Sequence, residues 1–215
     1  MKIAMIYEDK NILIVNKPAG LEVYDLETEL KKKYRKIQLA HRLDKDTSGL
    51  IILAKNEKTY EWIKEQFKER RVKKTYRAIA SGVLKPESGR PTGTVSAPIG
   101  RHPRDARKRV AGGQATGEKR EAITHYQILE NFKNHTYLEV RPQTGRTHQI
   151  RVHLQHLGYP ILGDKLYAPA RKGDTPTKRQ MLHAHKLRFV LPDGGEKEFT
   201  APLPGDFKKA LAELG

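Results

Sequence analysis

The chain has 215 residues, enough for one sizeable hydrophobic core or at most two small domains. It carries 42 Lys and Arg residues against 25 Asp and Glu, and a surplus of this size favours a polyanionic partner such as nucleic acid. The absence of cysteine excludes disulfides, a thiolate zinc site and a cysteine nucleophile, and no N-terminal apolar run is long enough for a signal peptide or membrane span. We therefore expect a soluble, cytoplasmic protein.

The first part of the chain predicts strands and helices in alternation. Residues 2–17 predict two short strands around a polar turn, and apolar side chains at helical spacing predict a short helix over residues 26–36. The unbroken apolar run at 49–55 predicts a buried strand. Asn56 is placed to cap the helix that follows, and residues 74–82 predict another strand.

The pattern changes between residues 84 and 119, which are rich in Pro, Gly and Arg. Only residues 94–99 resemble a strand there, and residues 101–120 hold seven Lys or Arg and two acids. A long irregular segment in a compact chain is usually a functional loop or disordered. Its charge favours a loop that is mobile when free and closes over an anionic partner.

The last part of the chain again predicts regular elements. Residues 122–129 and 135–142 predict a hairpin, and residues 147–158 predict a helix that stops at Gly158. The Asp-Gly-Gly sequence at 193–195 predicts a second hairpin turn, and Asp206 opens a final helix.

Strands outnumber helices in this series, and short turns join many of them. The sequence thus predicts a mixed α/β (α+β) fold with a mainly antiparallel central sheet and flanking helices. No linker divides the chain, so we expect a single domain over residues 1–215.

Asp44 lies in the stretch HRLDKDTSGL, between Arg42 and Lys45 and directly before a buried strand. In a cleft, neighbouring cations would keep its carboxylate ionised, and it could then act as a nucleophile or a base. The alternative is a loop aspartate that caps its own turn, and for an arbitrary Asp this structural role is more common than a catalytic one. Residues 46–49 suit the tight turn that would present Asp44.

The stretch RPQTGRTHQIR, residues 141–151, is a second candidate. It combines three arginines, Gly145 and a helix start, an arrangement suited to holding phosphates or a carboxylate. A solvated basic helix face would explain Arg151 but leaves the GRTHQ cluster unexplained. Tyr76, after two lysines, is either a half-buried packing residue or a ring that stacks on a base extruded from RNA.

Several histidines invite a metal interpretation. No pair has the spacing and intervening glutamate of a hydrolytic zinc helix, so core or RNA-facing histidines are the favoured account. The residues that a metal interpretation would use are His148, His153, His156, Asp164, His183 and His185. The sequence also has no P-loop and no dinucleotide fingerprint, which disfavours a nucleotide-driven enzyme.

Together and in order, these stretches resemble the RluA-type pseudouridine synthases. HRLDKDTSGLIILAK resembles the central motif of that family, KTYRAIASG the second and RPQTGRTHQIRVHLQHLGYPILGDKLYA the third. NKPAGLEV, EAITHYQIL and MLHAHKLRF also fit. The resemblance runs from Tyr7 to Asp206, and six ordered stretches make it specific where a lone HRLD would not be.

The resemblance implies three catalytic residues. Asp44 matches the essential aspartate that breaks the uridine glycosidic bond, by attack on the sugar or the base or by abstracting a ribose proton. Arg146 matches the arginine that pairs with this aspartate, and Tyr76 matches the tyrosine that stacks on the target base and helps remove the C5 proton.

The resemblance also implies how substrate is held. Ile150 matches an apolar support for the stacked base, and Arg42 matches an arginine that fills the gap left by a flipped base. Many relatives carry an S4-type RNA-binding module, whereas the pattern here starts within ten residues, so recognition is expected from residues 101–120 and 168–180. The residues expected to contact substrate are Arg42, Arg104, Arg107, Arg109, His148, Ile150 and Arg151.

The expected partner is ribosomal or transfer RNA, with no membrane, no metal and a monomeric enzyme. No cofactor is implied, because the isomerisation is redox-neutral. Another departure from the family is Tyr24, which stands where a histidine is common.

The main alternative is a non-catalytic RNA-binding or assembly factor on the same fold, and the matches at Asp44, Tyr76 and Arg146 argue against it. A metal-dependent nuclease is the third hypothesis, which a metal assay would separate.

Overall fold

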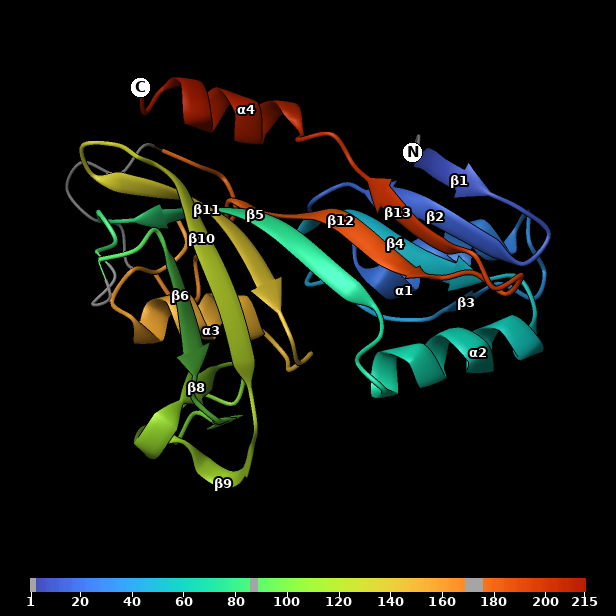
Figure 1. Cartoon of the computed structure of the whole chain (residues 1–215), viewed down its shortest axis with the longest axis horizontal. Coiled ribbons are helices and arrows are strands. Elements are labelled where there is room, and N and C mark those ends of the chain that lie inside the picture. Colours follow the sequence, from blue (N-terminus) through green and yellow to red (C-terminus); the bar gives the residue numbers. More distant parts are fainter. Residues whose placement is uncertain (1–2, 86–88, 169–175) are drawn as a thin grey trace. The chain divides into compact units, whose positions relative to one another are not determined.

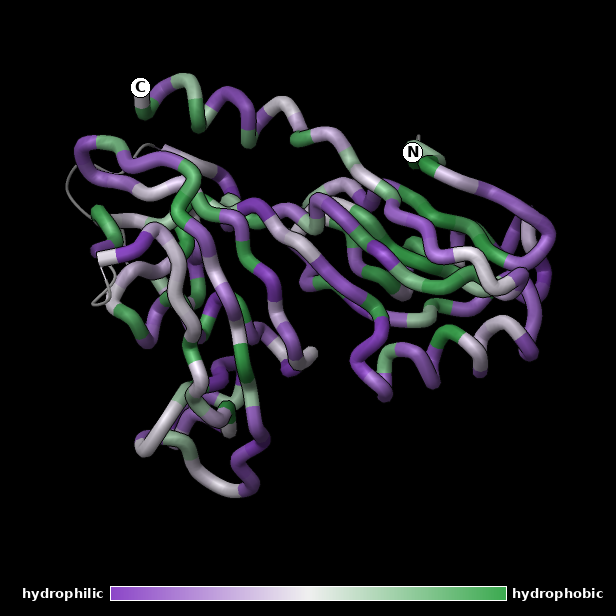
Figure 2. Tube along the Cα trace, viewed as in Figure 1, coloured by the Kyte–Doolittle hydropathy of each residue, from purple (hydrophilic) through white to green (hydrophobic). Residues whose placement is uncertain are grey.

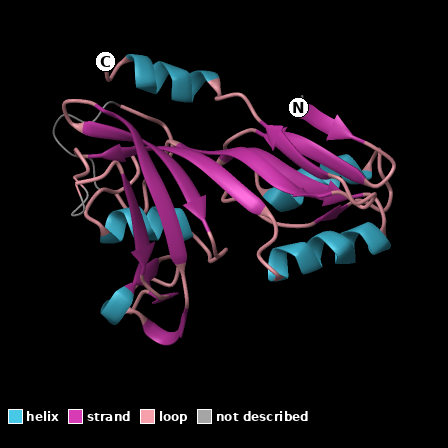
Figure 3. Cartoon of the chain, viewed as in Figure 1, coloured by secondary structure: helices cyan, strands magenta, loops and turns pink. Residues whose placement is uncertain are grey.

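The computed structural model describes residues 3–85, 89–168 and 176–215, and it contains both strands and helices (Figures 1 and 3). The chain divides into two compact units. The first comprises Met1–Lys74 and His183–Pro204, and the second comprises Thr75–Leu182 and Gly205–Gly215. The fold is mixed α/β with mainly antiparallel strands, which confirms the expected class. A single functional domain over 1–215 stays a prediction.

The first unit is built on strands in the order β1-β2-β4-β12, with β13 beside β12 and β3 beside β4. All these pairs are antiparallel except β4 with β12, which is parallel. The strands are β1 (Ala4–Glu8), β2 (Ile12–Lys17), β3 (Gln38–Leu39), β4 (Ser48–Ala54), β12 (Leu182–Val190) and β13 (Glu196–Thr200). The hairpin predicted at residues 193–195 is present between β12 and β13, and in its turn Asp193 Oδ1 accepts from the Gly195 amide.

Strands β2 and β4 form the centre of the first core. Ile12 and Ile14 of β2 pack with Leu50 and Ile52 of β4, and all four are buried. Because both strands are buried along nearly their whole length, their sequences are apolar runs without alternation. Figure 2 shows this apolar stretch in green.

Two helices belong to the first unit. Helix α2 (Glu57–Lys68) begins as predicted, with Asn56 Oδ1 accepting from the Thr59 amide at 3.0 Å. Helix α1 (Val23–Lys31) starts and ends earlier than the predicted 26–36. Val23, the first residue of α1, is buried and anchors the start of the helix in the core.

In the second unit, four strands pair antiparallel in the order β5-β11-β10-β6. Its strands are β5 (Lys73–Ser81), β6 (Thr92–Ser96), β10 (Ile123–Asn131) and β11 (His135–Pro142), and the first two residues of β5 fall in the first unit. Helix α3 (Gln149–His156) contributes buried apolar side chains to the core of the second unit. In helix α4 (Gly205–Ala212), Phe207 is fully buried. Gly158 follows α3 with φ +87°, as the predicted stop requires.

The basic segment 101–120 is not the irregular loop that the sequence predicts. It belongs to a small antiparallel sheet of order β8-β7-β9, made of β7 (Ile99–Arg101), β8 (Arg109–Ala111) and β9 (Thr116–Arg120), with a 3-10 turn, η1 (Gly112–Gln114), between the last two. Ile99 on β7, Ala111 on β8 and Ala115 before β9 are buried and supply the apolar anchors that the sequence did not reveal. Of the second segment expected to recognise RNA, residues 169–175 lie outside the described residues.

None of the described helices is long and apolar enough to cross a membrane.

Candidate active site

Asp44 lies in a tight turn immediately before β4. The Thr47 amide donates to the Asp44 carbonyl at 3.1 Å, which closes the turn, and Leu43 and Thr47 on either side are buried. The Asp44 side chain itself is half-buried, and Arg42 is exposed. The residues on either side of Asp44 are thus anchored by burial, whereas Asp44 itself is only partly covered.

His41, three residues before Asp44, has a role that sequence reasoning missed. Its Nε2 accepts from the Ile52 amide at 3.0 Å, and its ring lies 5.0 Å from the ring of Phe67. Removal from water, with a smaller contribution from the charge of Lys74, lowers the pKa of His41 to about 3. Desolvation likewise lowers the pKa of Lys74 to about 8. A neutral imidazole therefore fastens the start of the HRLD stretch to β4.

Gln149 organises the GRTHQ loop in the second unit. Its Oε1 accepts from the Thr144 hydroxyl and the Arg146 amide, and its Nε2 donates to the Ile123 carbonyl and the Thr124 hydroxyl oxygen. Every hydrogen-bonding position of this buried amide is matched to a neighbour. Within the polar cluster that a solvated helix face could not explain, Gln149 is thus the buried centre of a hydrogen-bond network that shapes the loop.

Arg146 and His148 lie on this loop. Arg146 is half-buried, and its Nε donates to the Glu121 carbonyl at 3.0 Å. His148 adopts φ +57°, a left-handed conformation uncommon outside glycine, and its Nδ1 lies 2.9 Å from the Tyr167 hydroxyl. The same hydroxyl accepts from the Arg109 amide at 2.8 Å. Tyr167, within the third motif, was another residue that sequence reasoning missed, and it links β8 to the His148 loop.

Arg151 is not on a solvated helix face. Its side chain is 7% exposed, and its Nε and Nη2 donate to the two carboxylate oxygens of Asp164 at 2.6 and 2.9 Å. Asp164 also accepts from the Leu166 and Tyr167 amides. This bidentate pair engages the guanidinium within the second unit, so the contact of Arg151 with substrate stays a prediction without support from its position.

Tyr76 and Ile150 share the core of the second unit. Ile150 on α3 is a buried member of the cluster, and Tyr76 on β5 is half-buried and packs against that cluster. Both readings of Tyr76 are compatible with this position, because a half-buried ring can pack on one side and offer the other to a ligand.

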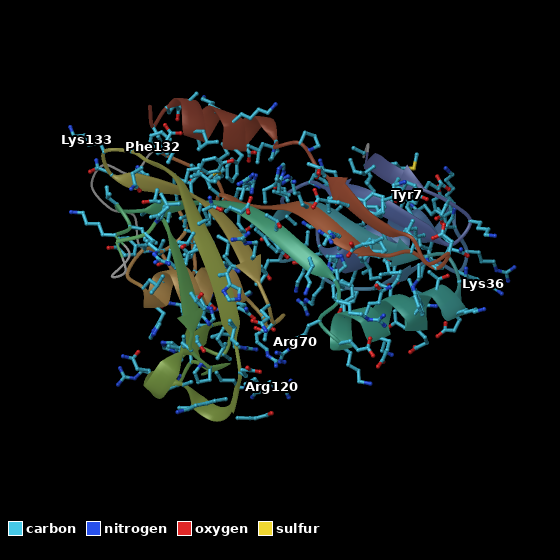
Figure 4. The ribbon with its side chains drawn as sticks, viewed as in Figure 1. Tyr7, Lys36, Arg70, Arg120, Phe132 and Lys133 are labelled. Carbon is cyan, nitrogen blue, oxygen red and sulfur yellow. The ribbon has the colours of Figure 1, made fainter. Side chains whose placement is uncertain are left out.

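The small sheet β7–β8–β9 presents most of the basic residues expected to contact RNA. Arg104 and Arg107 are exposed, and Arg107 binds both carboxylate oxygens of Asp105 at 3.0 and 2.9 Å. This contact lowers the pKa of Asp105 to about 2. Arg109 is half-buried and donates to the backbone carbonyls of Ala106 and Lys108. Figure 4 labels Arg120 on β9 of the same sheet.

The histidines are mostly structural. His153 is fully buried between the Thr124 hydroxyl and the Ala97 carbonyl, and burial lowers its pKa. His183 is also fully buried, with Nδ1 2.9 Å from the Ser48 hydroxyl. In the part of the chain that the structure describes, no three His, Cys, Asp or Glu side chains gather in a way that could hold a metal ion.

The expected site residues fall into two groups. Asp44 and Arg42 belong to the first unit, and the other eight belong to the second. Within the second unit the fold brings His148 and Arg109 to one tyrosine hydroxyl, and Tyr76 and Ile150 to one core. The pairing of Asp44 with Arg146 stays a prediction.

Comparisons with known proteins agree with each other. Residues 11–156 match the family model described as RNA pseudouridylate synthase. An uncharacterized RNA pseudouridine synthase of Chloroflexus aurantiacus is 43% identical over 93% of this chain and 65% of its own length. A Xanthomonas campestris protein named ribosomal large subunit pseudouridine synthase D is 41% identical over 98% of this chain and 69% of its own length.

Solved structures give the same result for the fold. Human RNA pseudouridylate synthase domain containing 1 has a TM-score of 0.83 and 27% identity, covering 99% of this chain and 94% of its own. Human RNA pseudouridylate synthase domain containing 4 has a TM-score of 0.80 and 28% identity, covering 98% and 92%. The chain thus spans almost all of these two structures and about two thirds of the curated relatives.

Proposed function

The chain belongs to the RNA pseudouridylate synthase family, and on this premise we propose that it isomerises a specific uridine to pseudouridine in ribosomal or transfer RNA. The observation that carries the proposal is the position of Asp44, half-buried on a turn closed by its own backbone at the mouth of a fully buried strand. The similar protein of Xanthomonas campestris is named for the large ribosomal subunit, so large-subunit ribosomal RNA is the first substrate to test.

The proposed reaction exchanges one glycosidic bond for another. The bond between N1 of uracil and C1′ of ribose breaks, the base turns, and a bond from C5 to C1′ forms. The C5 proton leaves to solvent and N1 gains a proton, so atoms and electrons balance without an oxidant, a reductant or an energy source. The chemistry requires one carboxylate that attacks or accepts a proton, and a pocket that holds the freed base.

We assign Asp44 to that carboxylate. Arg146 pairs with it and keeps it charged, and Tyr76 stacks on the flipped base, with Ile150 beneath the stack. Arg42, exposed beside Asp44, fills the gap that the flipped base leaves in the RNA. The half-buried Tyr76, packed on the core that contains Ile150, supports the stacking role.

The sheet β7–β8–β9 is the proposed RNA-binding surface. Arg104 and Arg107 are exposed in the segment between β7 and β8, and Tyr167 joins β8 to the loop that carries Arg146 and His148. Phosphate contacts here would fix the register of the RNA without reading its sequence.

We further propose that the enzyme acts as a monomer in the cytoplasm. Sedimentation with and without RNA would test the oligomeric state, and fractionation of the source cells would test the location.

The deciding experiment incubates the protein with large-subunit ribosomal RNA and transfer RNA transcripts labelled with tritium at C5 of uridine. Tritium release reports the reaction, and sequencing after carbodiimide modification maps the product. Asp44→Asn keeps the shape of the side chain but loses its charge and nucleophilicity, so we expect turnover to fall by at least about 10³-fold with RNA affinity kept. Asp46→Asn, the same change two residues along the turn, should stay within a few-fold of wild type. Near-normal turnover in Asp44→Asn would overturn the proposal, and inactive wild type that binds RNA would favour the non-catalytic alternative.

A further inference from the structure

The turn that carries Asp44 is held from below by a buried lysine. The Lys45 carbonyl, one residue after Asp44, accepts from the Lys17 Nζ at 2.8 Å and from the Gly20 amide at 3.0 Å. Lys17 closes strand β2, and its side chain is fully buried. Both donors come from the stretch NKPAG, which reaches the turn from elsewhere in the first unit.

Lys17 has a complete set of acceptors. Its ammonium group donates to the Pro18 carbonyl at 3.0 Å, the Leu21 carbonyl at 2.9 Å and the Lys45 carbonyl at 2.8 Å. Three N–H donors thus meet three oxygens, which is what burial of an ammonium requires. Two of these oxygens belong to its own loop and the third to the Asp44 turn, so the lysine ties the two loops together.

A second buried contact holds the other end of the turn. The Ser48 hydroxyl lies 2.9 Å from His183 Nδ1, and both residues are buried. His183 pairs with Ser48, and Ala184 with Gly49, where β12 runs parallel to β4. A Cβ on Gly49, which has φ +118°, would lie 2.3 Å from the Ala184 carbonyl oxygen, so β12 approaches β4 as closely as a glycine permits.

We infer that Lys17 and His183 are positioning residues, which clamp the Asp44 turn at Lys45 and Ser48 and so aim the Asp44 carboxylate at the target nucleotide. The inference rests on the proposed function of Asp44. Neither residue touches the substrate. A small displacement of a catalytic group lowers the rate of the chemical step with little effect on binding, and that is the signature of this clamp.

Three variants test it. Lys17→Met keeps most of the length of the side chain and removes its three donors, and Ser48→Ala removes the contact with His183 at almost constant volume. Gln66→Met is the matched control. Gln66 is as fully buried as Lys17, lies in the same unit, and makes two hydrogen bonds to the backbone of Val190, away from the turn.

The first readout is single-turnover tritium release at saturating enzyme, beside RNA affinity by filter binding. The probe is a C5-tritiated large-subunit ribosomal RNA transcript. We expect Lys17→Met to lower the rate constant about 10- to 100-fold, and Ser48→Ala several-fold, with affinity within about threefold of wild type. Gln66→Met should lower the melting temperature but keep the rate.

The second readout does not depend on activity. Amide hydrogen exchange over residues 44–49 should accelerate in Lys17→Met and not in Gln66→Met. Equal rates for these two variants, or unchanged exchange in the turn, would overturn the clamp. If Lys17→Met does not fold, an unchanged rate and unchanged exchange in Ser48→Ala would overturn it instead. If wild type and Gln66→Met release no tritium, the proposed function fails and the exchange experiment alone decides the clamp.

Discussion

At the scale of the residue, His41 shows how one neutral side chain can set a pH limit on the fold. Its Nε2 must be unprotonated to accept from the Ile52 amide, and its pKa of about 3 in the folded protein agrees with that role. A histidine side chain in water ordinarily has a pKa of 6.5. Below that pH the unfolded chain binds a proton that the folded chain does not bind until about pH 3.

The predicted consequence is a loss of stability on acidification. Between pH 6.5 and 3 the free energy of unfolding should fall, and the contribution of His41 should be on the order of 1 to 2 kcal/mol at pH 5. His41→Gln keeps an acceptor for the Ile52 amide but cannot be protonated, so its stability relative to wild type should rise from pH 7.5 to pH 5 in urea titrations. His156→Gln, at an exposed histidine, is the control. A difference between His41→Gln and wild type that does not change with pH would contradict this account.

At the scale of the element, the sheet β7–β8–β9 is basic, as the sequence predicts, but its backbone is ordered in strands. The sequence predicts a mobile basic loop, but the backbone of residues 99–101, 109–111 and 116–120 is paired in strands. Buried Ile99, Ala111 and Ala115 hold the sheet, and the arginines lie on strands or on the turn that they frame. The basic surface is therefore largely preformed, which lowers the entropy lost on binding.

This arrangement predicts that the arginines can be removed without unfolding the sheet. The triple variant Arg104→Ala, Arg107→Ala, Arg109→Ala should weaken RNA binding about tenfold or more near physiological salt and leave the melting temperature within a few degrees. Amide exchange on β8 and β9 should stay slow, which shows that the sheet persists.

A control with the same loss of charge lies on the β12–β13 hairpin of the first unit. Lys186→Ala, Arg188→Ala and Lys197→Ala remove three further cations, two of them paired with Glu198 and Glu196 across the strands. Equal losses of RNA affinity in the two triple variants would show that net charge alone matters, and that the sheet is not the binding surface.

At the scale of the whole molecule, the net charge of +17 predicts binding that depends steeply on salt. Each phosphate neutralised releases counterions and contributes about 0.7 to 0.9 to the slope of log affinity against log salt. The plot should be linear. In the triple variant of the small sheet, the magnitude of the slope should fall by the amount expected for about one to three lost phosphate contacts. Filter binding between 50 and 300 mM salt (roughly the range where such slopes are measured) is the test. A flat response in wild type would mean that the surplus charge is only solvated.

The sequence by itself determined the class of fold, the family and most local elements. The hairpin turn at Asp193, the cap at Asn56 and the stop at Gly158 were all readable, because turn chemistry and helix ends depend on a few adjacent residues. The apolar runs of β2 and β4 were likewise readable as buried strands. The motif that contains Asp44 is local, and so the sequence alone could propose a catalytic role for Asp44, which stays a prediction.

Only the tertiary structure decided what holds that residue in place. The contact of Ser48 with His183 joins residues 135 positions apart, and the contact of Lys17 with Lys45 joins residues 28 apart. Arg151 looked solvated until Asp164 was found beside it in the interior. No local pattern encodes such pairs, because the register between distant strands is set by how whole faces pack in the core. A lysine or arginine in the sequence therefore shows its charge, and only the fold shows whether that charge meets water, a carboxylate or the backbone carbonyl of the turn that carries Asp44.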